Sequence, residues 1–376
     1  MALTNKLTNI ADAIRNKTGK TELLTLDEMP VEIESIQSGE EGYTYEGSMA
    51  YMFYDNLSNS SSSSEDLKNG FSRLTTAAVN GIKNTKDVTS LYRCFYQNKY
   101  VTEIPFEINI TDGATFNEAF YSASNLTKCP KINGKPGVTS FMFYNCNDLT
   151  DVSALEDMEF NDERSTNARS GMFQWCSSLR HIPEKLLRKV GHCRNGNYYL
   201  YLFSYCTVLE EVLNLGVTES TVTSNGFSST FATTSRLKRM TFETNEDGTP
   251  KTAKWHTQTI SLNSYAGYMS GTSYATNAGF TEDTRVTDDA TYQALKDNPD
   301  YWTTDRNYSR YNHDSAVETI NSLPDTSAYL ATQSSKTNTI KFTGTAGALT
   351  DGGAINTLTE EEIAVAAAKG WTVSLA

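Results

Sequence analysis

One spacing occurs six times in the middle of this chain and constrains the fold more than any other feature. A phenylalanine is followed six residues later by Leu or Val, and three residues after that by another apolar residue or Cys. The phenylalanines are 25, 23, 30, 30 and 28 residues apart. Fixed offsets within a motif and variable lengths between motifs predict an α/β repeat solenoid in which each repeat buries one apolar row. The copies are Phe95/Val101/Ile104, Phe120/Leu126/Cys129, Phe143/Leu149/Val152, Phe173/Leu179/Ile182, Phe203/Leu209/Val212 and Phe231/Leu237/Met240.

Composition favours a binding protein over several other classes. Hydrophobic residues make up 38% of the 376 residues, which suits a repeat protein with a thin core better than a compact enzyme. The net charge of -13 argues against nucleic acid as a partner, because phosphate contacts need a basic surface. No run of eighteen apolar residues occurs, so we expect no membrane insertion. The first residues lack the apolar centre of a signal peptide, so we expect synthesis in a cytoplasm.

Three cysteines share one slot of the repeat. Cys146, Cys176 and Cys206 each follow the repeat phenylalanine by three residues, and the other copies hold Asn, Ala or Thr there. A slot filled by such residues requires a small side chain, which predicts a row of buried thiols. The chain has no CxxC pair, so we expect neither a zinc site nor any other metal, and no cofactor.

The sequence divides into four regions. Residues 1–38 predict a helical attachment module, with a capping box that starts at Thr25 and includes Glu28. Residues 39–84 predict a linker and a degenerate capping coil, with a low-complexity run at 58–66. Residues 85–245 hold the repeats, each with a short strand after the Leu. Residues 246–376 predict a mixed α/β cap with a strand at 337–342, a helix begun by a second capping box at 359–362, and a final strand.

Three segments carry a resemblance to known proteins. MFYNCNDLTDVSAL, MFQWCSSLRHIPEKL and LFSYCTVLEEVLNL resemble BspA-like leucine-rich repeats. The opening LTNIADAIRNKTGKTELLTLDEMPVEIESI is similar to N-terminal modules of phage virion proteins, and TLTEEEIAVAAAKGWTVSL resembles the C-terminus of repeat proteins in phages. The resemblance covers about 160 residues in the repeats, while residues 246–358 match no repeat.

The resemblance implies a role in a phage particle. It implies a non-enzymatic virion protein of the tail-fibre or receptor-binding type, made in the host cytoplasm and released by lysis. Its partners would be other virion proteins, bound through residues 1–38, and a host surface protein or glycan. A homo-oligomer is implied too, with a trimer as one form. Two alternatives stay open, namely an architectural virion decoration without a receptor and a bacterial surface adhesin.

Two sets of residues are candidates for binding. The first is a charged stripe, made of the two residues that follow each repeat Leu and that we expect to point away from the core. The binding candidates in it are Lys128, Asp151, Arg180, His181, Glu210, Glu211, Lys238 and Arg239. The second set is aromatic and lies among aspartates in residues 297–314, where rings beside carboxylates suit sugars. It comprises Tyr301, Trp302, Tyr308 and Tyr311. For each set the alternative is ordinary solvated or core packing.

The sequence gives little support for an enzymatic function. Some phage tail proteins cleave polysaccharide with paired carboxylates, and Asp297, Asp300, Asp305 and Asp314 are acids of the right type. Spacing alone does not bring two of them face to face. The chain contains no GxSxG, HExxH, Walker or GxGxxG motif, so we expect no catalytic residues.

Overall fold

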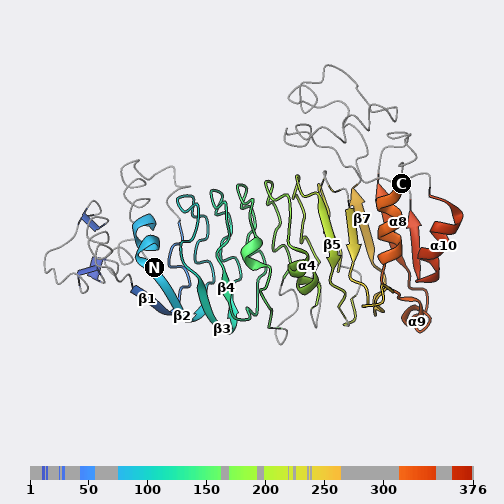
Figure 1. Cartoon of the computed structure of the whole chain (residues 1–376), viewed down its shortest axis with the longest axis horizontal. Helices are drawn as coiled ribbons and strands as arrows, with labels where there is room; N and C mark the ends of the chain where they lie inside the picture. Colours follow the sequence, from blue (N-terminus) through green and yellow to red (C-terminus); the bar gives the residue numbers. More distant parts are fainter. Residues whose placement is uncertain are drawn as a thin grey trace, which may run out of the picture.

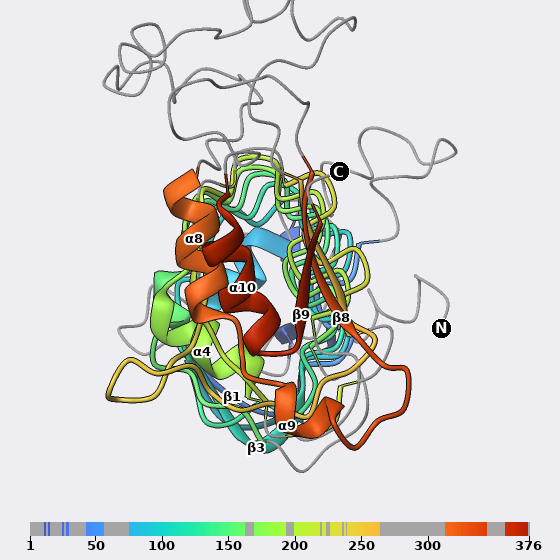
Figure 2. The ribbon, with the colours of Figure 1, turned by 90° about the vertical axis from the view of Figure 1, so that its right-hand side faces the viewer.

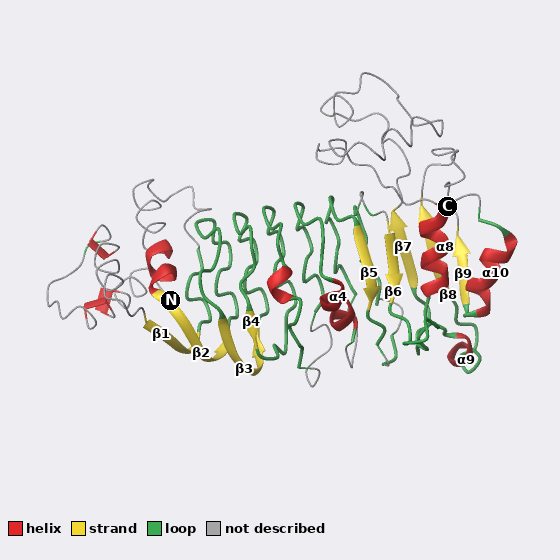
Figure 3. Cartoon of the chain, viewed as in Figure 1, coloured by secondary structure: helices red, strands yellow, loops and turns green. Residues whose placement is uncertain are grey.

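The chain folds into an elongated body of short parallel strands, turns and a few helices (Figure 1). Strands lie at both ends of the long axis, and turns and loops make up most of its middle (Figure 3). The computed structural model describes residues 11–12, 14–15, 25, 28–29, 43–55, 75–161, 169–192, 199–218, 220–222, 226–234, 237, 239–263, 313–343 and 358–374.

Every strand pair in the three sheets is parallel. The first sheet has the order β1-β2-β3-β4, the second contains β5 and β6, and the third has the order β7-β8-β9. The strands are β1 (Tyr43–Ser48), β2 (Ile82–Ser90), β3 (Ile108–Thr115), β4 (Ile132–Asn133), β5 (Glu211–Leu215), β6 (Arg239–Phe242), β7 (Thr259–Asn263), β8 (Asn338–Thr343) and β9 (Trp371–Ser374). The fold is therefore mixed α/β, with short parallel strands in small sheets.

Three helices, α4, α8 and α10, lie on the same side of the molecule (Figure 2). Seen along the long axis, α4, α8 and α10 lie on one side and strands β8 and β9 on the other (Figure 2). Residues 75–81 are helical as well, and the helices whose two ends are described are η1 (Ser153–Leu155), α4 (Glu184–Gly191), α8 (His313–Ser322), α9 (Ser327–Leu330) and α10 (Glu360–Ala368). Helix α4 buries Leu186, Leu187 and Val190 on one face, and its basic residues Arg188 and Lys189 fall in the last turn, where they favour the helix dipole.

The repeat phenylalanines form one continuous column in the core. All six predicted members are buried, and Phe53 extends the column by one ring on the N-terminal side. Neighbouring ring centroids lie 4.9 to 6.4 Å apart along the column, and four successive pairs are within 10° of parallel. We call this set the phenylalanine column: Phe53, Phe95, Phe120, Phe143, Phe173, Phe203 and Phe231.

Backbone hydrogen bonds join each repeat to the next around this column. The phenylalanine and the residues two before and two after it donate their N–H groups to carbonyls of the following repeat, for example Phe143 to Met172 and Asn145 to Gln174. The two flanking residues adopt positive φ in repeat after repeat, for example φ 53° at Phe141 and φ 58° at Asn145. This conformation costs about 1 kcal/mol or more in a residue other than glycine, so the inter-repeat bonds must offset it.

The cysteine slot links repeats through side chains. Cys146 donates its thiol to the carbonyl of Phe120 at 3.0 Å, Cys176 to Phe143 at 3.0 Å and Cys206 to Phe173 at 2.9 Å. Asn98 and Thr234, in the same slot, donate to Phe53 and Phe203. The prediction of buried free thiols is confirmed for these three cysteines. In five of the six repeats, the side chain in this slot therefore donates a hydrogen bond to the carbonyl of the preceding column phenylalanine. The donor is a short thiol or hydroxyl in four of them and the longer amide of Asn98 in the fifth. Ala123, in the remaining repeat, has no side-chain donor.

Several predicted elements are confirmed, mostly in the C-terminal region. Thr359 and Glu362 form the capping box at the start of α10, and Gly370 with φ 84° follows this helix before β9. Strand β8 (Asn338–Thr343) overlaps the predicted strand at 337–342 in all but its first residue. The Thr25–Glu28 capping box also forms, while most of residues 1–38 lie outside the described part.

A strand was predicted after the Leu of every repeat, but strands form in only some of the repeats. They form as β5 and β6, and Lys128 and Asp151 make an isolated parallel bridge. The prediction is wrong for the repeats of Phe95, Phe143 and Phe173, because residues 101–106 form no strand, residues 153–155 form η1 and residues 184–191 form α4. Leu186, Leu187 and Val190 have helical spacing and bury one face.

Candidate functional site

The charged stripe is largely neutralised by ion pairs between neighbouring repeats. Lys128 pairs with Asp151 at 3.5 Å, and Arg180 pairs with Glu210 at 2.7 Å. Arg239 lies 3.4 Å from Glu211. Each of these charges already has a partner, so the stripe offers a receptor less free charge than its sequence suggests.

Glu210 contradicts the expectation that both residues after the repeat Leu point away from the core. Its side chain is only 9% exposed and receives a hydrogen bond from Arg180. Burial of a carboxylate is stable only with such a partner, so this pair is part of the packing. His181 lies beside it and is exposed, as expected.

The remaining candidates fall outside the described residues. Lys238 lies there, and so do Tyr301, Trp302, Tyr308 and Tyr311. Their roles stay predictions from sequence.

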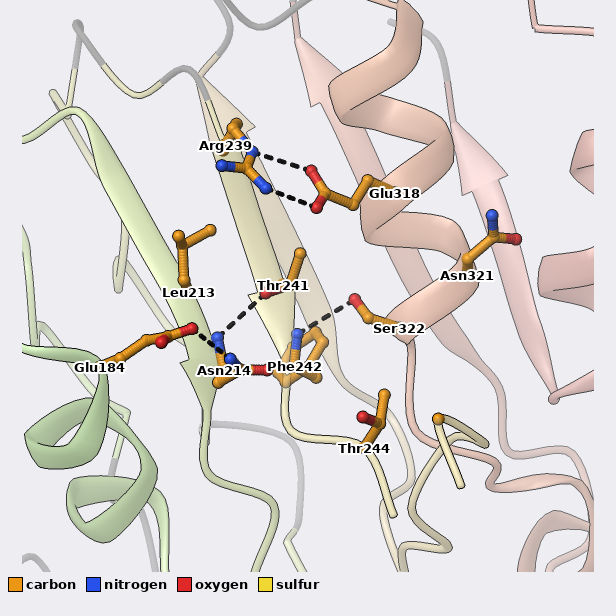
Figure 4. A pocket seen from close by; sticks show the side chains of 11 residues that line it. Glu184, Leu213, Asn214, Arg239, Thr241, Phe242, Thr244, Glu318, Asn321 and Ser322 are labelled. Carbon is orange, nitrogen blue, oxygen red and sulfur yellow. Dashed lines mark hydrogen bonds and ion pairs between the residues drawn. The ribbon is translucent and has the colours of Figure 1, made fainter. Parts of the chain in front are cut away.

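The C-terminal end of the stripe borders a cavity of about 290 Å³ between α4, β5, β6 and α8 (Figure 4). Arg239 is the one stripe residue that lines it. Other polar lining residues come from each of the four elements: Glu184, Asn214, Thr241, Glu318, Asn321 and Ser322. We call this cavity the polar pocket.

Hydrogen bonds fix the walls of the polar pocket. Arg239 donates two hydrogen bonds to Glu318 of α8, at 2.7 and 3.0 Å, and this pairing raises the pKa of the arginine. Asn214 donates its side-chain amide to Glu184 and its backbone N–H to Thr241. Ser322 accepts a hydrogen bond from the backbone N–H of Phe242. The walls are therefore prearranged rather than assembled by a ligand.

The chemistry of the polar pocket suits a small hydroxylated or amine-bearing group. Two carboxylates, Glu184 and Glu318, and one guanidinium line the pocket, so charged acceptors outnumber charged donors, and Phe242 and Leu213 add apolar surface. The volume is at the lower end for small-molecule sites, which limits the occupant to one such group. The pocket was missed from sequence because α8 was not predicted. Ala316, Ile320 and Leu323, all buried, have the helical spacing that could have revealed it.

A second charge cluster surrounds one buried carboxylate at the end of β6. Glu243 is 7% exposed and pairs with His192, with Arg188 at 3.8 Å and with Lys251 at 3.9 Å. Burial alone would raise the pKa of Glu243, but the hydrogen bond from His192 and the neighbouring cations outweigh burial and lower it. This cluster ties the end of α4 to the residue after β6.

Metal and membrane chemistry find no support in the described part of the chain. Among those residues no group of three or more His, Cys, Asp or Glu side chains is placed to hold a metal ion. None of the helices described is long and apolar enough to span a bilayer.

Comparisons with known proteins add no relative. No protein-family model matches the chain, and neither a curated protein nor a solved structure matches it.

Proposed function

We propose that the chain is a BspA-like leucine-rich-repeat solenoid that serves in a phage virion as a tail-fibre or receptor-binding protein and acts without catalysis. The phenylalanine column is the observation that supports the solenoid best, because seven rings follow one another at 4.9 to 6.4 Å and backbone hydrogen bonds recur from one repeat to the next. The assignment to a virion rests on the sequence resemblance of both termini.

A binding role fits the outer surface of such a scaffold. Repeats that contact only their neighbours leave a long face on which side chains recur at a regular spacing, and this arrangement suits an extended partner. The polar pocket supplies one further recess on the same body. Residues 1–38 would attach the protein to the particle or to sister copies, as a homo-oligomer.

The test is binding of the labelled full chain to the bacteria that the parent phage infects. We expect saturable binding to cells, competition with infection by the added protein, and detection of the protein in purified particles by mass spectrometry. Presence in particles without binding to the infected host would favour the architectural decoration. Absence from particles would favour the bacterial adhesin.

A further inference from the structure

A row of stacked tyrosines runs along the outside of four successive repeats. The residue directly after the column phenylalanine is Tyr54, Tyr96, Tyr121 and Tyr144 in turn. Their ring centroids are 5.3, 4.7 and 4.3 Å apart, and all four side chains are partly exposed. Tyr96, Tyr121 and Tyr144 stack within 13° of parallel, and Tyr54 is tilted by 34° from Tyr96, so the row presents ring edges and hydroxyl groups to solvent at the spacing of the repeats.

In the next two repeats the exposed ring lies two residues after the column phenylalanine instead of one. Gln174 takes the tyrosine slot in the first of them, and Trp175 stacks on Tyr205 with centroids 3.9 Å apart and rings 5° from parallel. Trp175 is 37% exposed, although it is among the largest apolar side chains of the protein. Among the described residues no other ring lies against it. We call the whole line the aromatic ridge: Tyr54, Tyr96, Tyr121, Tyr144, Trp175 and Tyr205.

This shift by one residue places two amides beside two rings. Asn145 and Gln174 occupy the slots diagonal to Tyr144 and Trp175, and the backbone N–H of Asn145 donates to the carbonyl of Gln174 at 2.8 Å. The Asn145 amide also donates to Ser122 at 3.1 Å. Amides and hydroxyls beside aromatic rings can both donate and accept hydrogen bonds without net charge.

The aromatic ridge is almost uncharged in a strongly acidic protein. The positions compared are those two residues before, one after and two after each column phenylalanine. Among the described residues at these positions, the charged side chains with solvent exposure are Arg93 and Glu118. These two pair at 2.7 Å, and the guanidinium lies 4.9 Å from the ring centre of Tyr96. The whole chain carries a net charge of -13. An anionic ligand would be repelled by the protein at large, and a cationic ligand would find no free carboxylate in these slots.

We propose that the aromatic ridge binds a neutral polysaccharide along its length, with Tyr144 and Trp175 as the principal contacts. Pyranose rings present apolar C–H faces, which can pack against the tyrosine ring edges and against the face of Trp175 that is turned away from Tyr205. Their hydroxyl groups match the tyrosine hydroxyls and the amides of the ridge. A chain polymer can make the same contact at each repeat, so weak contacts add along the line. A line of single residues suits such a chain better than a folded protein, which needs a broad patch. The inference rests on the proposed binding function and names its ligand class.

Two substitutions test the ridge with little risk to folding. Trp175→Asn introduces the residue that the preceding repeat holds in that slot, and Asn tolerates the positive φ of 66° found there. Tyr144→Gln introduces the residue that the following repeat holds in the tyrosine slot. Val365→Ala on α10 is the matched control, because Val365 is 38% exposed and lies far from the ridge in sequence.

The measurement is affinity of the full chain for immobilised mannan, galactan and glucan, beside anionic alginate. We expect the wild-type chain and Val365→Ala to bind at least one neutral polymer and not alginate. Trp175→Asn and Tyr144→Gln should each weaken that binding about tenfold. Failure of the wild-type chain to bind any neutral polymer, or equal binding by the ridge variants, would overturn the inference.

Binding to cells separates this inference from the proposed function. Equal binding of the wild-type chain and both ridge variants to cells would support the receptor-binding role and show that the ridge takes no part in it. Binding that survives periodate oxidation of the cells but not protease treatment would assign a protein ligand and overturn the glycan inference. Loss of all cell binding by the wild-type chain would instead overturn the proposed function.

Discussion

The slot three residues after each column phenylalanine shows how a single side chain joins two repeats. A carbonyl such as that of Phe143 accepts both the backbone N–H of Cys146 at 3.2 Å and the thiol of Cys176 at 3.0 Å. The sequence showed that the slot requires a small residue, but the identity of the partner needed the structure. The acceptor lies 33 residues away, and no local pattern encodes that contact.

Loss of the donor in this slot should destabilise the protein. We expect Cys176→Ala to lower the free energy of unfolding by about 1 to 2 kcal/mol, because it removes a buried hydrogen bond and leaves a small cavity. Cys176→Ser keeps a donor of similar size and should cost less. Urea unfolding followed by tryptophan fluorescence measures both. Equal losses in the two variants would show that packing alone, and not the hydrogen bond, determines the choice of residue.

At the scale of elements, two glycines set the distance between α4 and the end of β5. A Cβ atom on Gly216 would lie 1.8 Å from the carbonyl oxygen of Arg188, and one on Gly191 would lie 2.0 Å from the carbonyl oxygen of Gly216. Both contacts are with backbone, so the two elements would have to separate. Gly216→Ala should therefore cost about 2 to 3 kcal/mol of unfolding free energy.

A second glycine substitution controls for backbone strain in that experiment. Gly248 has φ 81°, and a Cβ atom added to it would have no other atom within 4 Å, so Gly248→Ala should cost about 1 kcal/mol from conformation alone. Chemical denaturation of both variants gives the comparison. A Gly216→Ala variant no less stable than Gly248→Ala would contradict the close contact between α4 and β5.

The capping box of α10 gives a prediction that the sequence made and the structure bears out. Thr359 accepts the N–H of Glu362, and the Glu362 carboxylate accepts the N–H of Thr359. Thr359→Ala should lower the unfolding free energy by about 1 kcal/mol, because the N–H of Glu362 in the first turn loses its fixed acceptor. Thermal unfolding followed by circular dichroism tests this, with Glu361→Ala as the control inside the same turn. An unchanged Tm would mean that α10 contributes nothing to the cooperative unit.

Elements that are marked by a short sequence motif could be predicted from the sequence. Elements that depend on contacts between residues of different repeats could not. Thr359, Glu362 and Gly370 lie close together in the sequence, and they located α10 and β9. The positive-φ residues around the column are Arg, Gln, Glu, Phe and Trp as well as Asn and Gly, so their side chains gave no signal of that backbone. Phe53 belongs to the degenerate capping coil predicted at 39–84, and its triplet Met-Phe-Tyr at 52–54, which recurs at 142–144, is the signal that could have counted it as a seventh repeat phenylalanine. The polar pocket needed four elements that meet only in the folded chain.

Over the whole molecule, one buried cluster runs from Met49 near β1 to Trp371 in β9. The two ends differ in how they finish this core. Phe53 stacks on Phe95 at the N-terminal end, while the C-terminal end is closed by β9 and by Trp371, whose indole donates to the carbonyl of Pro324 at 2.8 Å. A continuous core couples distant repeats, so a change in one slot should register in the unfolding of the entire described body.

The buried thiols of this core predict loss of stability at alkaline pH. Burial raises the pKa of Cys129 and Cys206 to about 12, and it raises the pKa of Cys94, Cys146 and Cys176 as well. In the unfolded chain these thiols ionise near pH 9, so between pH 9 and about 12 the unfolded state binds fewer protons than the native state. Their contribution is therefore complete below pH 9, and the unfolding free energy should fall above it by about 1.4 kcal/mol per pH unit for each thiol.

Two other kinds of side chain modify this slope. Burial raises the pKa of Tyr43 to about 12, which adds to the loss above pH 10. Burial lowers the pKa of Lys369 to about 8, which has the opposite sign, because the unfolded lysine keeps its proton up to about pH 10.5. Five thiols outnumber one lysine, so the net slope is negative. Urea unfolding with reductant at pH 8.5, 9.5 and 10.5 measures it, and Cys206→Ser should make it shallower by one thiol. A slope that is positive, or that does not change in Cys206→Ser, would show that ionisation of the buried thiols does not control alkaline stability.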